Sequence, residues 1–302
     1  MQTVKLSIFD NFKCLASDCK DSCCNAGWQI DVDKKTMQKY SLCDGTFVQK
    51  IRDNIEQIDK QYCIKCHNGK CPFFRDDGLC DIVKNKGDGF LGEVCRNFPR
   101  INNYVAGRRE QTLSFACEEV VRQVLNQYKI TFVYENIKKD VLLKDKAFAI
   151  RDDLINYVQN KELSFSQKIE HLIQESKYYL TDFEKMKSLL KSCEWLKTDI
   201  SNFDFEEHIK PCQKNFALTD NQLENVFVCF IFRYLINNEY KYSLNARLRF
   251  CIFSILLCDY LVLQNRNKKI DDSEINAIKE YSREIENSSK NVNFLLNFFN
   301  FQ

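Results

Sequence analysis

Residues 12–30 read FKCLASDCKDSCCNAGWQI, and the four cysteines of this stretch decide how the chain is organised: Cys14, Cys19, Cys23 and Cys24. Four thiols so close in sequence cannot each fill a separate apolar niche. They indicate ligands of a metal ion or of an iron–sulfur cluster, or else disulfides. Vicinal Cys23 and Cys24 fit a zinc knuckle poorly because their side chains diverge, whereas two neighbouring thiolates can serve different irons of one cluster.

The residues that precede this stretch bear on the choice between metal and disulfide. Residues 1–10 contain neither the apolar segment nor the small-residue cleavage site of a signal peptide. We therefore expect a cytoplasmic protein, in a compartment where thiols are kept reduced. There a cysteine cluster is more often a metal site than a set of disulfides. An iron–sulfur cluster, zinc and redox-active thiols all remain open.

A second set of cysteines follows within the first 120 residues: Cys63, Cys66, Cys71, Cys80, Cys95 and Cys117. The two-residue spacing of Cys63 and Cys66 is by itself typical of a zinc knuckle, with His67 as a further candidate ligand. Cys43 has no partner at a useful spacing, and we interpret it as incidental.

The balance of charge excludes two classes of partner. The 302 residues include 44 basic and 42 acidic side chains, for a net charge of +2. Such a balance provides no electrostatic footprint for nucleic acid or for an anionic membrane surface. We expect a protein that binds neither.

Glycine and proline divide the chain in two. All eight glycines and two of the three prolines lie between residues 27 and 107. Because these residues mark turns, the first part should be rich in loops and the second nearly uninterrupted helix. We predict a mostly α protein, with a cysteine-rich, loop-rich, metal-binding part (residues 1–120) packed on an all-α helical body (residues 121–302).

The second part has the periodicity of buried helices. Apolar residues recur at helical spacing from Leu223 to Leu235, behind the candidate cap Thr219. Residues 250–263 are almost wholly apolar but contain Asp259, and a membrane span needs about 20 residues. We predict a buried central helix there. Three cysteines on these helices are predicted to be small core residues: Cys229, Cys251 and Cys258.

The first 120 residues resemble the flagellin lysine-N-methylase family, part of a wider group named for a cysteine cluster that chelates zinc or iron. The motifs that carry the resemblance are Phe12 to Ile30, Cys71-Pro72, Gly78-Leu79-Cys80, Cys95-Arg96-Asn97-Phe98-Pro99-Arg100 and Leu113-Ser114-Phe115-Ala116-Cys117. The chain departs from the family at Cys117-Glu118-Glu119, where a proline usually follows the cysteine, and its helical part is shorter. Cys63 and Cys66 lie outside the family pattern.

The resemblance implies methyl transfer from S-adenosylmethionine to lysine side chains of flagellin, with a [4Fe–4S] cluster and with zinc as the alternative. The metal ligands that it implies are Cys14, Cys19, Cys23, Cys24, Cys71, Cys80, Cys95 and Cys117. No glycine-rich turn of a doubly wound methyltransferase is present, so the cofactor must bind elsewhere. An open iron could chelate its amino and carboxylate groups, with Arg96 or Arg100 paired to the carboxylate.

Two other functions are compatible with the same residues. One is a non-catalytic, zinc-stabilised interaction protein, and the other is an iron–sulfur protein of electron transfer or redox sensing. Neither the catalytic residues nor the oligomeric state is indicated by the sequence.

Overall fold

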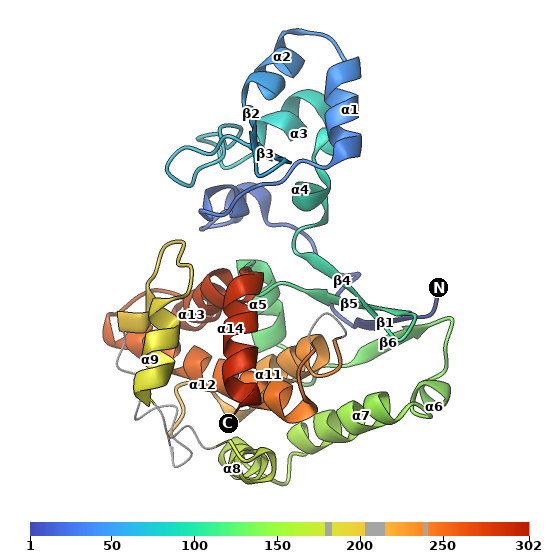
Figure 1. Cartoon of the computed structure of the whole chain (residues 1–302), viewed down its shortest axis with the longest axis vertical. Helices are drawn as coiled ribbons and strands as arrows, with labels where there is room; N and C mark the ends of the chain where they lie inside the picture. Colours follow the sequence, from blue (N-terminus) through green and yellow to red (C-terminus); the bar gives the residue numbers. More distant parts are fainter. Residues whose placement is uncertain (179–182, 203–214, 238–240, 302) are drawn as a thin grey trace. The chain divides into compact units, whose positions relative to one another are not determined.

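The computed structural model describes residues 1–178, 183–202, 215–237 and 241–301 (Figure 1). It divides into two compact units. We call Lys13–Pro99 the cysteine unit. The helical unit combines Met1–Phe12 with Arg100–Gln302.

The units separate at residues 12 and 99, and not near residue 120 where the glycine distribution suggested a boundary. The physical reason is strand pairing. Strand β1 (Thr3–Leu6) lies parallel to β5 (Arg108–Leu113), which also pairs with β4 (Arg100–Val105). The N-terminal segment and residues 100–113 are thereby bonded into the helical unit, although they belong to the glycine-containing part of the sequence.

The cysteine unit consists of short helices, one hairpin and connecting loops. Its regular elements are α1 (Lys34–Leu42), α2 (Thr46–Asp53), β2 (Ile55–Ile58), β3 (Gln61–Ile64), α3 (Asp81–Lys86) and α4 (Glu93–Asn97). A small apolar core holds them together, formed around Ile30, Val32, Tyr40, Ile51, Ile64 and Phe73.

Asp33 joins two of these helices. As the N-cap of α1, its carboxylate accepts the Thr36 N–H at 2.9 Å, and it also accepts the Glu93 N–H at the start of α4 at 2.9 Å. Burial favours the neutral carboxyl, but these hydrogen bonds outweigh it and lower the pKa of Asp33 to about 2. The cap therefore stabilises both the helix and the junction between α1 and α4.

Two glycines bring the cysteine-bearing loops together. The Gly27 N–H donates to the Gly69 carbonyl at 3.2 Å, and both residues have positive φ (+92° and +74°). A Cβ at Gly69 would lie 2.9 Å from the Gly27 Cα, closer than real side chains come. Only glycine therefore allows the loop after Cys24 to lie against the loop before Cys71.

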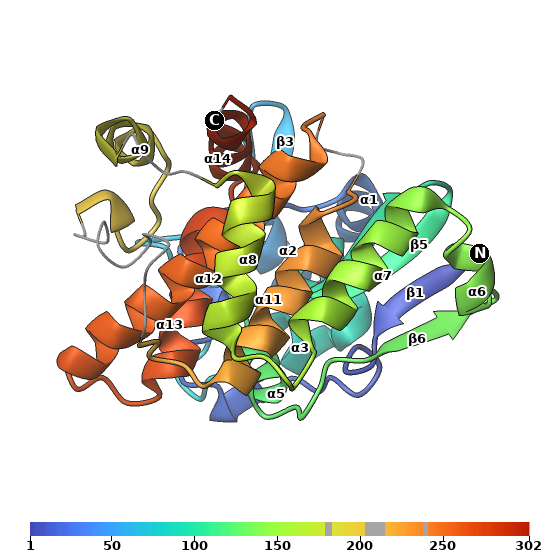
Figure 2. The same cartoon turned by 90° about the horizontal axis from the view of Figure 1, so that it is seen from below.

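The helical unit contains a four-stranded sheet in the order β4–β5–β1–β6, where β6 is Phe132–Glu135. Strands β1 and β6 are antiparallel, with Thr3 opposite Glu135 and Leu6 opposite Phe132. Figure 2 shows this sheet beside α7 (Lys146–Val158).

The sheet corrects the prediction that residues 121–302 are all helical, because β6 lies within them. This four-residue strand pairs with the N-terminal segment, more than 120 residues away in sequence, so no local pattern indicates it. The broader prediction is confirmed, since the chain is mostly α.

The remaining helices form the body of this unit. Their bounds are α5 (Glu118–Leu125), α6 (Lys139–Leu142), α8 (Phe165–Ser176), α9 (Phe183–Lys191), α11 (Asp220–Tyr234), α12 (Leu244–Asn267), α13 (Ser273–Tyr281) and α14 (Ser289–Asn300). A π-helical turn, Ser282–Glu286, continues α13. Helix α11 packs against α5, α7, α8 and α12, and α12 packs against α13 and α14 (Figure 2).

The central helices confirm the sequence pattern. Thr219 is the N-cap of α11, within a capping box that it forms with Gln222. Residues 250–262 of α12 are buried, and the Asp259 carboxylate accepts the backbone N–H groups of Ala217 and Leu218 at 3.0 and 2.7 Å. The three cysteines on α11 and α12 are core residues, as predicted. Among the described helices, none has the length and apolar character that crossing a membrane requires.

Candidate metal centre

The vicinal cysteines lie in a single 3₁₀ turn, Cys23–Asn25. The turn is capped by Ser22, whose hydroxyl accepts the Cys24 N–H at 3.2 Å. A hydrogen bond between the two thiols lowers the pKa of Cys24 and raises that of Cys23. The two thiols therefore lie close together in this turn.

Cys24 is the centre of the thiols that the cysteine unit gathers. Its carbonyl accepts the Cys71 N–H at 2.8 Å, which ties the first cysteine loop to the second. The thiols close enough for their charges to interact with that of Cys24 are those of Cys23, Cys66, Cys71, Cys80 and Cys95. The charges of Cys14 and Cys95 act on Cys23 as well.

Separate elements position these thiols. Cys80 is the N-cap residue of α3, and its side chain makes no capping hydrogen bond. Cys95 lies within α4, and Cys71 follows the turn closed by His67 and Lys70. Residues far apart in the chain therefore supply donors to one region of the unit.

Cys66 belongs to this region although it lies outside the family pattern. Its pKa is raised by burial and by the charges of Cys24 and Cys63. Cys63 itself is fully buried, and its thiol donates to the Glu56 carbonyl of the hairpin at 3.8 Å, so it is a packing residue. The two-residue spacing of this pair was the signal that identified Cys66 in the sequence.

Backbone hydrogen bonds place two more of the predicted ligands. Cys117 belongs to the helical unit, where it caps α5 and donates its N–H to the Ser114 carbonyl at 3.2 Å. Cys19 follows a short 3₁₀ turn and is half-buried, with its N–H bonded to the Ala16 carbonyl.

In the described part of the chain, the thiols around Cys24 do not form a complete set of metal ligands. Every cysteine among the described residues is free of disulfides. Across those same residues, no three His, Cys, Asp or Glu side chains are arranged so that they could hold a metal ion. Burial raises the pKa of Cys71 well above the usual range of a thiol. Thiolates are the donor type that soft metals prefer, and binding a metal would release the thiol protons.

The two predicted cofactor-binding arginines already have partners. In the cysteine unit, Arg96 donates to the Leu91 carbonyl at 2.8 Å. In the helical unit, Arg100 donates to the Phe12 carbonyl at 3.3 Å, and its guanidinium lies 5.3 Å from the centre of the Phe12 ring. Arg100 thus has a structural role at the junction of β4 and the N-terminal segment.

Trp28 and Gly27, both in the opening motif, also have structural roles. The Trp28 ring lies 5.4 Å from that of Phe98 and packs on the small core of the cysteine unit. The backbone of Gly27 closely approaches that of Gly69. The fold and the thiols together define a mostly α protein with a cysteine-rich candidate metal centre.

Known proteins show to which family such a chain belongs. A Salmonella muenchen protein named flagellar biosynthetic protein FliU is 31% identical over 154 residues, which are 46% of this chain and 90% of that protein. Lysine-N-methylases of Salmonella choleraesuis and Salmonella typhimurium are each 35% identical, over 123 and 122 residues. These matches cover 38% of this chain and 30% of each methylase. The chain belongs to the family of FliU and these lysine-N-methylases.

The chain spans less than a third of the length of the methylases it matches. No family model matches it. No solved structure matches it either.

Proposed function

We propose that the chain takes part in the methylation of protein lysine side chains, with S-adenosylmethionine as the methyl donor. The similarity to two lysine-N-methylases carries this proposal. The name of the FliU relative supports a flagellar substrate, and flagellin is the substrate that we propose. In this reaction a lysine nitrogen forms a bond to the methyl carbon while the bond from carbon to sulfur breaks. The ammonium proton must leave first, because the free pKa of lysine is about 10.4.

We further propose that the cysteine unit holds a [4Fe–4S] cluster, with zinc as the alternative. The thiols gathered around Cys24 would supply the ligands, and the resemblance adds Cys14 and Cys19. When bound, a cluster with an open iron would chelate the amino and carboxylate groups of S-adenosylmethionine. The Gly27–Gly69 contact supports this by keeping two cysteine loops together.

The metal is tested by analysing protein purified without oxygen for iron, sulfide and zinc. Iron and sulfide in equal amounts, with a broad visible absorption band, support the cluster. Zinc in their place, with no binding of S-adenosylmethionine by calorimetry, favours a zinc-stabilised interaction protein. Iron and sulfide without such binding favour an iron–sulfur redox protein.

The activity is tested by co-expressing the chain with flagellin and weighing the flagellin. The expected result is a series of mass increments of one methyl group. They should disappear with Cys24→Ser and persist with Cys43→Ser, a matched control in the same unit whose thiol lies outside the set around Cys24. Flagellin of unchanged mass with the native chain would contradict the proposal.

A further inference from the structure

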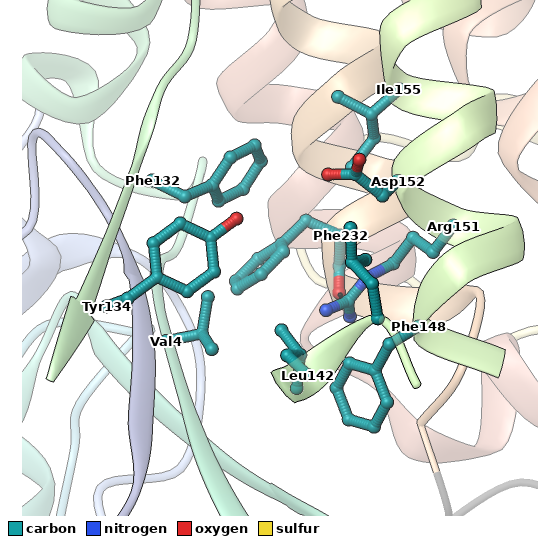
Figure 3. Close-up of a pocket in the computed structure, with 10 residues that line it drawn as sticks. Val4, Phe132, Tyr134, Leu142, Phe148, Arg151, Asp152, Ile155 and Phe232 are labelled. Atoms are coloured by element: carbon teal, nitrogen blue, oxygen red, sulfur yellow. Dashed lines mark hydrogen bonds between the residues drawn. The ribbon is translucent and has the colours of Figure 1, made fainter. Parts of the chain in front are cut away.

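A small cavity opens in the helical unit between β6 and α7 (Figure 3). Its volume is about 20 Å³, which is space for one or two groups the size of a water molecule. Its lining combines aromatic rings with polar groups, and the residues that matter are Phe132, Tyr134, Phe148, Arg151, Asp152 and Phe232.

One polar group in this cavity lacks a partner. Figure 3 shows the Tyr134 hydroxyl directed from β6 toward α7. In the part of the chain that the structure describes, this hydroxyl makes no hydrogen bond to the protein, and the half-buried side chain leaves it accessible to solvent. A phenol oxygen in that position can accept a hydrogen bond from a ligand.

The arginine in the wall cannot serve as an anion site. Arg151 and Glu110 are buried and form a two-bond pair, with Nη1 to Oε2 at 2.8 Å and Nη2 to Oε1 at 2.5 Å. Arg151 also donates to the Phe232 carbonyl and stacks 4.6 Å from the centre of that ring. Its charge is neutralised, and both Nη atoms donate to protein groups.

The carboxylate at the rim already binds an ammonium group. Lys139, on α6, places its Nζ 2.7 Å from a carboxylate oxygen of Asp152. This hydrogen bond is the main reason that the pKa of Lys139 is raised, and the negative charge of Asp152 adds to it. The Lys139 side chain is 42% exposed and the Asp152 side chain 18% exposed. Pairs this open to solvent contribute little to stability, so another amine can replace Lys139.

We propose that this cavity is a docking site for the ammonium group of a lysine side chain on a protein partner, which exchanges with Lys139. The Asp152 carboxylate provides the charge, the Tyr134 oxygen a second acceptor, and the rings of Phe132 and Phe232 the apolar walls that attract a cation. The small volume suits a primary ammonium and excludes a trimethylammonium group.

The site serves recognition and not methyl transfer. A carboxylate beside a lysine stabilises its charged form, whereas the amine must be neutral when it attacks a methyl group. The site would anchor a lysine next to the one that is modified, and in this respect the inference rests on the proposed function.

Amine binding is tested directly on the full chain, labelled with ¹⁵N and titrated with n-butylammonium chloride. The backbone signals of β6, α6 and α7 should shift and saturate. Neutral n-butanol and butyltrimethylammonium should leave them unchanged. Equal shifts with the amine and the alcohol, or no shifts, would overturn the proposal.

Variants assign the binding to its residues. Asp152→Asn should weaken butylammonium binding about tenfold or more, and Tyr134→Phe should weaken it less, because a charged acceptor contributes more than a neutral one. Lys139→Gln should strengthen binding, since the internal competitor is removed. Asp153→Asn is the matched control on the same helix, because Asp153 is exposed and outside the cavity, and it should bind as the native chain does. Equal affinities of the Asp152 and Asp153 variants would refute the assignment.

Methylation kinetics separate this inference from the proposed function. If both hold, Asp152→Asn raises the KM for the protein substrate and leaves kcat unchanged. If this variant methylates its substrate with the same KM as the native chain, the docking site is refuted and the proposed function is not. If the chain binds the amine saturably but methylates no protein, the proposed methylase function is refuted and the docking site is not.

Discussion

The ion pair between Glu110 and Arg151 offers a stability prediction that the structure makes quantitative. The side chains are 3% and 5% exposed, and two charge-assisted hydrogen bonds join them. Glu110→Gln removes the negative charge and leaves the guanidinium buried without a counter-ion. Breaking a buried pair in this way costs about 3–5 kcal/mol. Because Arg151 keeps the Phe232 carbonyl and two aromatic rings, we expect about 3 kcal/mol.

The assay is urea unfolding of the full chain, followed by the helical circular dichroism signal. The double variant Glu110→Gln/Arg151→Met should recover most of the lost stability, since no charge is then buried. Glu194→Gln is the exposed control: the Glu194–Lys290 pair lies on the surface, and its loss should leave the midpoint unchanged. A loss below about 1 kcal/mol in Glu110→Gln would refute the reasoning, because that is the behaviour of an exposed pair.

Three further predictions concern the cysteine unit. Gly69→Ala should lower the melting temperature clearly more than Gly87→Ala does. The backbone angle φ is nearly the same at the two positions (+74° and +75°), but only at Gly69 would the added Cβ meet another backbone. Equal losses in melting temperature would show that the strain of a positive φ accounts for the whole effect and that the contact with Gly27 contributes nothing. Asp33→Asn should cost about 2 kcal/mol at neutral pH. The pKa of Asp33 is lowered in the folded state, so its contribution is present above pH 4 and lost as the pH falls toward 2, and an unfolding series over that range should show the native chain converging on the variant. Cys66→Ser should reduce the metal bound per chain while Cys43→Ser should not, as measured by elemental analysis, and full occupancy in the Cys66 variant would remove that residue from the ligand set.

The helical core was predictable from sequence because its signals are local. Thr219 and Gln222 form a capping box three residues apart, and the apolar run at residues 250–263 is too short for a membrane and too continuous for a surface helix. Asp259 can be buried in the middle of that apolar run because two backbone N–H groups donate hydrogen bonds to its carboxylate.

The sheet and the division into units could not be read in the same way. Strand β1 pairs with β5 and β6, both more than 100 residues away, and such pairing leaves no periodic pattern in a four-residue strand. The ligand set stays a prediction: cysteine spacing indicates candidate donors, Cys66 among them, but it does not show that Cys117 belongs to the helical unit, because that assignment depends on long-range strand pairing.

The central proposal is methyl transfer to protein lysines that depends on the cysteine unit. The most direct measurement incubates protein purified without oxygen with flagellin and S-adenosylmethionine carrying a deuterated methyl group, and identifies labelled lysines by peptide mass spectrometry. The account predicts deuterated methyl-lysine with the native chain and with Cys43→Ser, and none with Cys24→Ser. Flagellin without label from metal-loaded native chain, or equal labelling by the Cys24 variant, would contradict it.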